Sequence, residues 1–183
     1  MIKVKRTEIP EVFVLTMTPH KDERGFFYEA YNKAALSDIG IKENFVQDNH
    51  SASKKGVLRG LHYQVRQVQG KMVRVISGEI FDVAVDLRRK SSSFGRWVGV
   101  TLSADKFSQI WIPAGFAHGF YTISDWAEIL YKTTDYYAPQ WERTLRWDDP
   151  QVAIQWPIVG GERPLLSQKD LLGKWLEDAE VYE

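Results

Sequence analysis

Cysteine is absent from the 183 residues, and neither sign of charge is in excess, because 24 lysines and arginines balance 24 aspartates and glutamates. The missing thiols exclude a disulfide-stapled scaffold and any thiolate metal or redox site. The zero net charge argues against a nucleic-acid binder or a polybasic membrane module, which need a clustered excess of one sign. We therefore expect neither nucleic acid nor a membrane among the partners.

Long hydrophobic runs are also missing. The first ten residues lack the apolar stretch that a secretory signal needs. The longest run without a charged side chain, residues 107–124, is 18 residues long and is interrupted by proline, glycine, histidine and glutamine. A membrane-spanning helix needs about 20 mostly apolar residues. These absences predict a cytoplasmic protein, and the chain length predicts a single domain over residues 1–183.

Short apolar stretches with a period of two dominate the chain and predict an all-β protein. Its 9 phenylalanines, 8 tyrosines and 7 tryptophans favour pleated surfaces, on which aromatic rings pack well. The spacing of the stretches is typical of an antiparallel sandwich or barrel. Strands are predicted at residues 12–16, 25–29, 58–64, 73–76, 80–87, 97–102, 109–112, 119–123, 128–134 and 145–147.

Two segments have the pattern of short helices. Asn32 is a typical cap for a helix over 33–39. Ser167 is placed to cap a second helix over 168–176, with Asp170 as the partner in a capping box.

Ser77-Gly78 predicts a two-residue hairpin turn between neighbouring strands. That pairing puts Lys71 opposite Ala84 and near Asp82, on a mostly apolar face. A lysine on such a face, close to a carboxylate, is a candidate site group. The alternative is a lysine at a frayed strand end that reaches into water.

Two histidines lie beside glycines that permit close approach. On a regular strand, His62 lies on the face opposite to Arg59, but a bulge at Gly60 would bring both to one mouth. His118 follows a Pro-Gly turn and leads into an apolar strand. Each histidine alone has an ordinary structural explanation as a hydrogen-bonded core residue, whereas the two together indicate a shared cavity.

The remaining polar candidates have structural explanations from pattern alone. Tyr131 and Tyr137 fall on one face of a strand, where tyrosines usually pack with the hydroxyl at the rim. Asp170 is accounted for as a helix cap, and Arg24 as a solvated residue in a turn.

Taken in order, these segments resemble one family over nearly the whole chain, the dTDP-4-dehydrorhamnose 3,5-epimerases of the cupin type. The resemblance implies an antiparallel double-sheet jelly roll with short flanking helices. The motifs that carry it are Asp22-Glu-Arg-Gly-Phe-Phe27, Phe45-Val-Gln-Asp-Asn-His50, Gly56-Val-Leu-Arg-Gly-Leu-His-Tyr-Gln64, Gly70-Lys71, Phe81-Asp-Val-Ala-Val-Asp86, Phe94-Gly95, Pro113-Ala-Gly-Phe-Ala-His-Gly-Phe120, Tyr131-Lys-Thr-Thr134, Trp147-Asp-Asp-Pro150 and Leu166-Ser-Gln-Lys-Asp170.

The resemblance implies a reaction in dTDP-L-rhamnose biosynthesis. In dTDP-4-dehydro-6-deoxy-D-glucose the C4 ketone acidifies the C3 and C5 protons, and inversion at both carbons gives dTDP-4-dehydro-L-rhamnose. Such inversion needs a base on one face, an acid on the other and a cation at the enolate oxygen. By resemblance, His62 is the base, oriented by Asp170, Tyr131 is the opposite-face acid and Lys71 is the cation.

The resemblance also implies a binding set and a homodimer with exchange of N-terminal strands. Because that strand crosses to the partner subunit, its residues Arg24 and Glu29 would serve the neighbouring chain's site. Tyr137 would stack on the ligand. The residues implied to hold the nucleotide and sugar are Arg24, Glu29, Gln47, Asn49, Arg59, His118 and Glu142.

Two departures from the family pattern are visible. Residues 65–69, Val-Arg-Gln-Val-Gln, lack a proline pair common in this loop and are one residue shorter, which bears on how the loop approaches the nucleotide. Ser91-Ser-Ser-Phe94 replaces a commoner Ser-Pro-Thr-Phe. Neither departure touches a proposed catalytic residue.

Other functions are open to the same fold. A metal-dependent cupin usually takes two histidines from an H-x-H motif, but here the motif is His62-Tyr-Gln64, so we expect no metal and no cofactor. A single-site C3 or C5 epimerase, or a 3,4-ketoisomerase, would share most of the binding residues. A non-catalytic sugar-nucleotide-binding cupin would need no acid–base pair.

Overall fold

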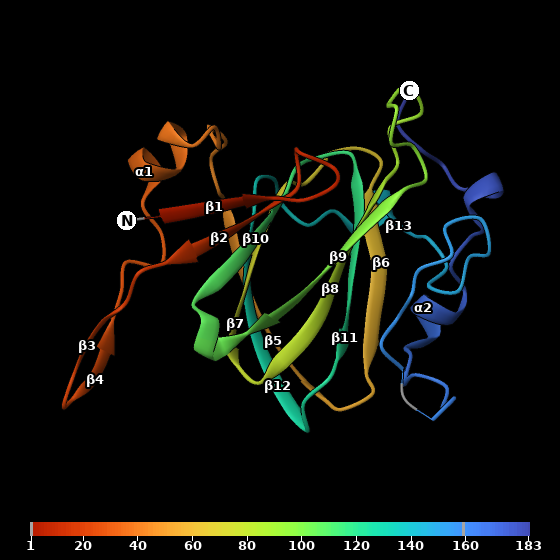
Figure 1. Cartoon of the computed structure of the whole chain (residues 1–183). Coiled ribbons are helices and arrows are strands. Elements are labelled where there is room, and N and C mark those ends of the chain that lie inside the picture. The colour runs from red at the N-terminus through yellow and green to blue at the C-terminus, as the bar shows by residue number, and fades with distance from the viewer. Residues whose placement is uncertain (1, 159) are drawn as a thin grey trace.

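The computed structural model describes residues 2–158 and 160–183. In these ranges, two antiparallel sheets face each other and enclose the main core (Figure 1). This arrangement confirms the predicted all-β class and the double-sheet jelly roll. Both short helices lie outside the sandwich: α1 (Lys33–Asp38) and α2 (Gln168–Leu171).

The two sheets are built from strands that are distant in sequence. The six-stranded sheet has the order β1 (Ile2–Arg6), β2 (Phe13–Met17), β10 (Ser108–Ile112), β7 (Lys71–Ser77), β12 (Trp126–Thr133) and β5 (Gln47–Lys54). The five-stranded sheet has the order β13 (Glu142–Thr144), β6 (Leu58–Gln64), β11 (Phe116–Thr122), β8 (Glu79–Asp86) and β9 (Trp97–Ser103).

Three apolar clusters hold the described elements together. The main one lies between the sheets, where Val73 and Val75 of β7 meet Ile80 and Ala84 of β8. A second lies behind the five-stranded sheet, where the C-terminal segment covers Val83 and Val85 with Leu145 and Val152, among others. The third lies under α1, where Leu36 is packed with Met72 and Trp111. Burial on both faces of β8 explains its near-continuous apolar sequence.

The predicted hairpin between β7 and β8 is wrong. β7 pairs with β10 and β12 in one sheet, and β8 pairs with β11 and β9 in the other. Ser77-Gly78 therefore connects the two layers instead of two neighbours. The physical reason is that the apolar faces of both strands point at each other across the core, which buries more of them than side-by-side pairing would.

Two predictions near the C-terminus also need correction. The strand predicted at 145–147 lies earlier, as β13, and Leu145 forms only an isolated bridge with Lys174. The helix predicted over 168–176 ends at Leu171. It stops because the following residues run back along β13, where the Lys174 amide donates to the Thr144 carbonyl.

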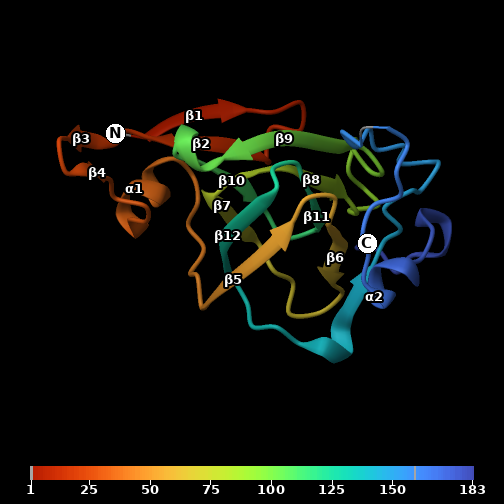
Figure 2. The same cartoon turned by 90° about the horizontal axis from the view of Figure 1, so that it is seen from below.

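An N-terminal hairpin extends away from the sandwich. It consists of β3 (His20–Asp22) and β4 (Gly25–Phe27), which pair only with each other (Figures 1 and 2). Phe26 and Phe27 on β4 are 61% and 72% exposed. Among the described residues, no helix is long and apolar enough to cross a membrane.

Candidate active site

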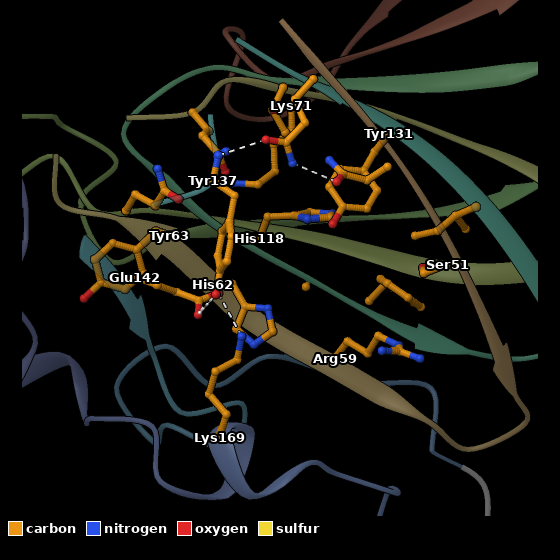
Figure 3. Close-up of a pocket in the computed structure, with 18 residues that line it drawn as sticks. Ser51, Arg59, His62, Tyr63, Lys71, His118, Tyr131, Tyr137, Glu142 and Lys169 are labelled. Atoms are coloured by element: carbon orange, nitrogen blue, oxygen red, sulfur yellow. Dashed lines mark hydrogen bonds and ion pairs between the residues drawn. The ribbon is translucent and has the colours of Figure 1, made fainter. Parts of the chain in front are cut away.

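A cavity of about 350 Å³ lies between the two sheets, and both sheets contribute side chains to it (Figure 3). The sequence-predicted residues that line it on the six-stranded sheet are Gln47, Asn49, Lys71 and Tyr131. Those on the five-stranded sheet are Arg59, His62, His118 and Glu142, and Tyr137 lies in the connection between β12 and β13.

His62 and Asp170 form a hydrogen-bonded pair at the wall of this cavity. The His62 Nε2–Asp170 Oδ1 distance is 2.6 Å, and Asp170 is only 2% exposed. Burial alone would raise the pKa of Asp170, yet hydrogen bonds from His62 and Ser167 hold that pKa below its ordinary value. A carboxylate bound to Nε2 fixes the ring and leaves Nδ1 as the nitrogen that accepts a proton.

The predicted helix cap and the predicted histidine partner are the same carboxyl group. Its Oδ2 accepts hydrogen bonds from the amide and the hydroxyl of Ser167, which completes the capping box of α2. Its Oδ1 is the oxygen that is hydrogen-bonded to His62. The N-terminus of α2 therefore sets the position of the histidine ring.

The predicted bulge at Gly60 is confirmed. His62 pairs with His118 and Arg59 pairs with Phe120, so β6 carries one residue more than β11 between the two pairs. Gly60 has φ +122°, and a Cβ there would lie 2.6 Å from the Gly119 Cα. Only glycine fits this conformation and this close approach. The bulge brings Arg59 and His62 to the same cavity.

Lys71 is a buried cation at the inner wall, 7% exposed. Its predicted inward direction is confirmed, although the facing sheet, and not a paired neighbour, supplies the carboxylate Asp82. Burial lowers the pKa of Lys71 to about 8, against the opposing influence of Glu142 and Asp82. A lysine in such a place is an ammonium with few competing partners.

Tyr131 lies across the cavity from His62, because β12 and β6 belong to facing sheets (Figure 3). Burial raises the pKa of Tyr131, as does Glu142, while Arg59 opposes them. The phenol therefore keeps its proton at neutral pH. A histidine–carboxylate pair and a proton-bearing phenol thus face the same space from opposite walls.

A second histidine–carboxylate pair lies deeper in the wall. His118 Nε2 is 2.9 Å from Asp82 Oδ2, and Asp82 is fully buried. Burial raises the pKa of Asp82, and His118 and Lys71 counteract that rise.

The rim of the cavity is a polar network. Glu142 accepts hydrogen bonds from Lys169 Nζ at 2.8 Å and from the Tyr137 hydroxyl at 2.9 Å. Gln47 donates to Asn49 at 2.8 Å and accepts from the backbone amide of Tyr137. This network joins β5, β13 and the residue before Asp170 at one opening.

Two predicted site residues do not reach this cavity within the chain. Arg24 lies in the turn of the β3–β4 hairpin and pairs with Asp22. Glu29 follows the hairpin and does not line the cavity. Neither position is near His62 in the described chain.

Several lining residues were not predicted. Ser51 lies on the polar strand β5, and Gln69 and Lys169 flank predicted residues in sequence. Their only sequence signal was that proximity. Among the described residues, no group of three or more histidine, cysteine, aspartate or glutamate side chains is placed to hold a metal ion.

Comparisons with known proteins agree on one family. The family model described as dTDP-4-dehydrorhamnose 3,5-epimerase matches residues 6–178. The Pseudomonas aeruginosa protein named dTDP-4-dehydrorhamnose 3,5-epimerase is 54% identical over 182 residues, which cover 99% of each chain.

Solved structures give the same result. A Legionella pneumophila dTDP-6-deoxy-D-glucose-3,5-epimerase in complex with dTDP-4-keto-L-rhamnose superposes with a TM-score of 0.95 at 50% identity, covering 98% of this chain and 95% of that one. The 3'-monoepimerase ChmJ from Streptomyces bikiniensis, in complex with dTDP-quinovose, has a TM-score of 0.86 at 30% identity, covering 94% of this chain and 87% of that one.

Proposed function

The chain belongs to the dTDP-4-dehydrorhamnose 3,5-epimerase family, and we propose that it inverts C3 and C5 of dTDP-4-dehydro-6-deoxy-D-glucose to give dTDP-4-dehydro-L-rhamnose. The observation that carries the proposal is the placement of a histidine–carboxylate pair and a protonated phenol on opposite walls of one cavity, beside a buried lysine. Inversion α to a ketone needs these groups in this arrangement.

Each inversion proceeds by removal and return of a proton. His62 takes the proton from C3 or C5, and the electron pair moves onto the C4 oxygen. Asp170 stabilises the imidazolium that forms. The ammonium of Lys71 faces the developing enolate charge. Tyr131 then donates its proton to the opposite face of the same carbon, and exchange with water restores both side chains.

The binding residues surround this centre. Arg59 is suited to the pyrophosphate, because its planar fork bridges two oxygens. Tyr137 lies at the mouth, where its ring is available for stacking on the base. Gln47, Asn49, His118 and Glu142 supply hydrogen bonds to the sugar and the nucleoside from both sheets.

The active form in this proposal is a homodimer in which the N-terminal hairpin reaches the partner's cavity. Arg24 and Glu29 lie outside the cavity of their own chain, and the hairpin extends from the sandwich with two exposed phenylalanines. Exposed apolar side chains on a protruding hairpin are typical of a segment that is covered in an assembly. Both charged residues would then complete the neighbouring site.

Proton NMR of the dTDP-4-keto-6-deoxyglucose substrate in deuterated water, with chelator-treated protein, tests the activity. Deuterium at both C3 and C5, and conversion to the L-rhamnose nucleotide by an added reductase, is the expected result. Exchange at one carbon only would place the protein with single-site epimerases such as ChmJ. Binding without exchange would leave a sugar-nucleotide-binding protein.

Two variants test the assigned roles. Replacing His62 by alanine is expected to abolish exchange at both carbons, because the base is lost. Tyr131→Phe is expected to permit some exchange but to block inversion, because the opposite-face proton is missing. Full inversion by either variant would refute the role given to that residue.

A further inference from the structure

Asp82 is a buried charge in an unusual place. It lies on β8 between Ile80 and Ala84, two residues of the main apolar core, and is 0% exposed. One oxygen accepts the bond from His118, while Oδ1 has no hydrogen-bond partner among the described residues. Such a half-satisfied buried carboxylate is destabilising, and an apolar residue would fill the position better.

The polar neighbours of Asp82 belong to the proposed active site. Asp82 pairs with Phe120 across β8 and β11, and on the other side of β11 His118 pairs with His62. β11 therefore lies between β8, which carries Asp82, and β6, which carries the proposed base His62. From the facing sheet, Lys71 contributes the opposite charge.

We propose that Asp82 is a positioning residue for the reaction, which fixes the His118 ring through its hydrogen bond and holds the ammonium of Lys71 charged through its own charge. The inference rests on the proposed function. It assigns to this buried carboxylate the task of maintaining the cation that meets the enolate oxygen.

The other titratable groups around Lys71 either act from the rim or carry no negative charge. Glu142 on β13 favours the charged lysine more strongly than Asp82 does, but it lies at the rim, where its oxygens also accept bonds from Lys169 and Tyr137. Tyr131 on β12 keeps its proton and carries no charge at neutral pH. His118 and His62, on β11 and β6, supply no negative charge. Asp82 is thus the fully buried carboxylate whose charge is not already engaged in the rim network.

Asp82→Asn removes the charge of the side chain but keeps its shape, and the amide oxygen can still accept the hydrogen bond from His118. Loss of the charge is expected to lower the pKa of Lys71 from about 8 by about one unit. The alkaline limb of kcat/KM then moves to lower pH by the same amount, and kcat/KM at pH 8 falls about fivefold. A structural role alone would lower the melting temperature and leave the limb in place.

Thr122→Val is the matched control. Thr122 is a buried residue of β11 whose hydroxyl also has no partner among the described residues, but it does not line the cavity. Its variant is expected to keep the wild-type pH profile. An unchanged alkaline limb in Asp82→Asn would overturn the proposal.

NMR titration of ε-¹³C-labelled lysine tests the same proposal without substrate. The Lys71 signal is identified as the one missing from Lys71→Met. Its midpoint is expected near 8 in the wild-type protein and lower in Asp82→Asn, and equal midpoints would refute the inference. If instead the wild-type protein catalyses no exchange while the midpoints differ, the proposed function fails and the Asp82–Lys71 coupling stands.

Discussion

At the scale of single residues, the proposed chemistry requires a charge in a place where charge is destabilising. The folded-state pKa of Lys71 is about 8, below the ordinary 10.5. Between these values the unfolded chain binds more protons than the folded one, so stability rises with pH in that window. Below pH 8 the folded protein carries the full desolvation cost of the ammonium.

Lys71→Met is therefore expected to stabilise the protein at pH 7 by about 3 kcal/mol, because the pKa falls from 10.5 to about 8 on folding and each pKa unit is about 1.4 kcal/mol. The gain shrinks to about 1 kcal/mol at pH 10, where most of the penalty is relieved in the wild-type protein. Urea unfolding at both pH values measures it. Proton exchange into the substrate is expected to fall at least about a hundredfold.

Lys132→Met is the matched control for that prediction. Lys132 lies on β12 and pairs with Asp48 at the surface at 2.9 Å. Its loss is expected to change stability by less than about 1 kcal/mol at either pH. A Lys71→Met protein that is less stable than wild type at pH 7 would show that the favourable contacts of Lys71 outweigh the burial cost of its ammonium.

Single positions also show the limits of sequence reasoning. Pattern alone assigned Asp170 to the helix cap, and the family resemblance assigned it to His62. The structure shows both contacts on separate oxygens of one carboxyl group. A local motif reveals a contact three residues away, whereas the contact with His62 spans 108 residues and has no local signal.

At the scale of elements, the predicted strands were mostly those with a buried face. β6 was predicted with its observed bounds, because Leu58 and other buried apolar residues punctuate it. β5 was missed, because its inward side chains Gln47, Asn49 and Ser51 line the cavity and are polar. The site itself thus removed the alternation that identifies a strand.

Strand pairing was harder to predict from the sequence than strand position. The Ser77-Gly78 turn satisfies the local rules for a hairpin, yet its two strands lie in different sheets. Local sequence describes the turn, but the choice of neighbour depends on which apolar faces meet across the core. The predicted direction of Lys71 was right because burial of its strand face is common to both arrangements.

The N-terminus of α2 couples helix stability to the proposed base. Ser167→Ala removes a cap, which is expected to cost about 1 kcal/mol in the free energy of unfolding. It also removes a hydrogen bond that lowers the pKa of Asp170. That pKa then rises, Asp170 is protonated at higher pH, and the acidic limb of kcat/KM moves to higher pH.

A pH–rate profile that extends below pH 4 measures this shift, because the pKa of Asp170 lies below the ordinary 3.8 in the wild-type protein, and urea unfolding measures the stability change. Ser167→Thr keeps the hydroxyl and is expected to retain the wild-type limb. A Ser167→Ala protein that loses stability with no movement of the acidic limb would show that the cap and the histidine pair act independently.

At the scale of the whole molecule, the cavity and the hairpin of one chain carry different parts of the predicted site. The cavity contains the proposed catalytic groups, while Arg24 and Glu29 of the same chain lie elsewhere. The hairpin pairs with no other strand among the described residues. In a symmetric dimer, each hairpin occupies the same relation to the partner's cavity, so both sites are completed together.

Mixing two inactive variants tests this exchange. The His62→Ala chain lacks the base but can still supply Arg24 to its neighbour. The Arg24→Ala chain retains the base, but in its own homodimer neither subunit can supply the Arg24 guanidinium. In a mixed dimer, the Arg24→Ala chain has His62 and receives Arg24 from its neighbour. With random subunit exchange, about half of the dimers are mixed and one site in each is complete, so about a quarter of the wild-type activity is expected at low substrate. If Arg24 serves its own chain, mixing restores nothing beyond the activity of the separate variants.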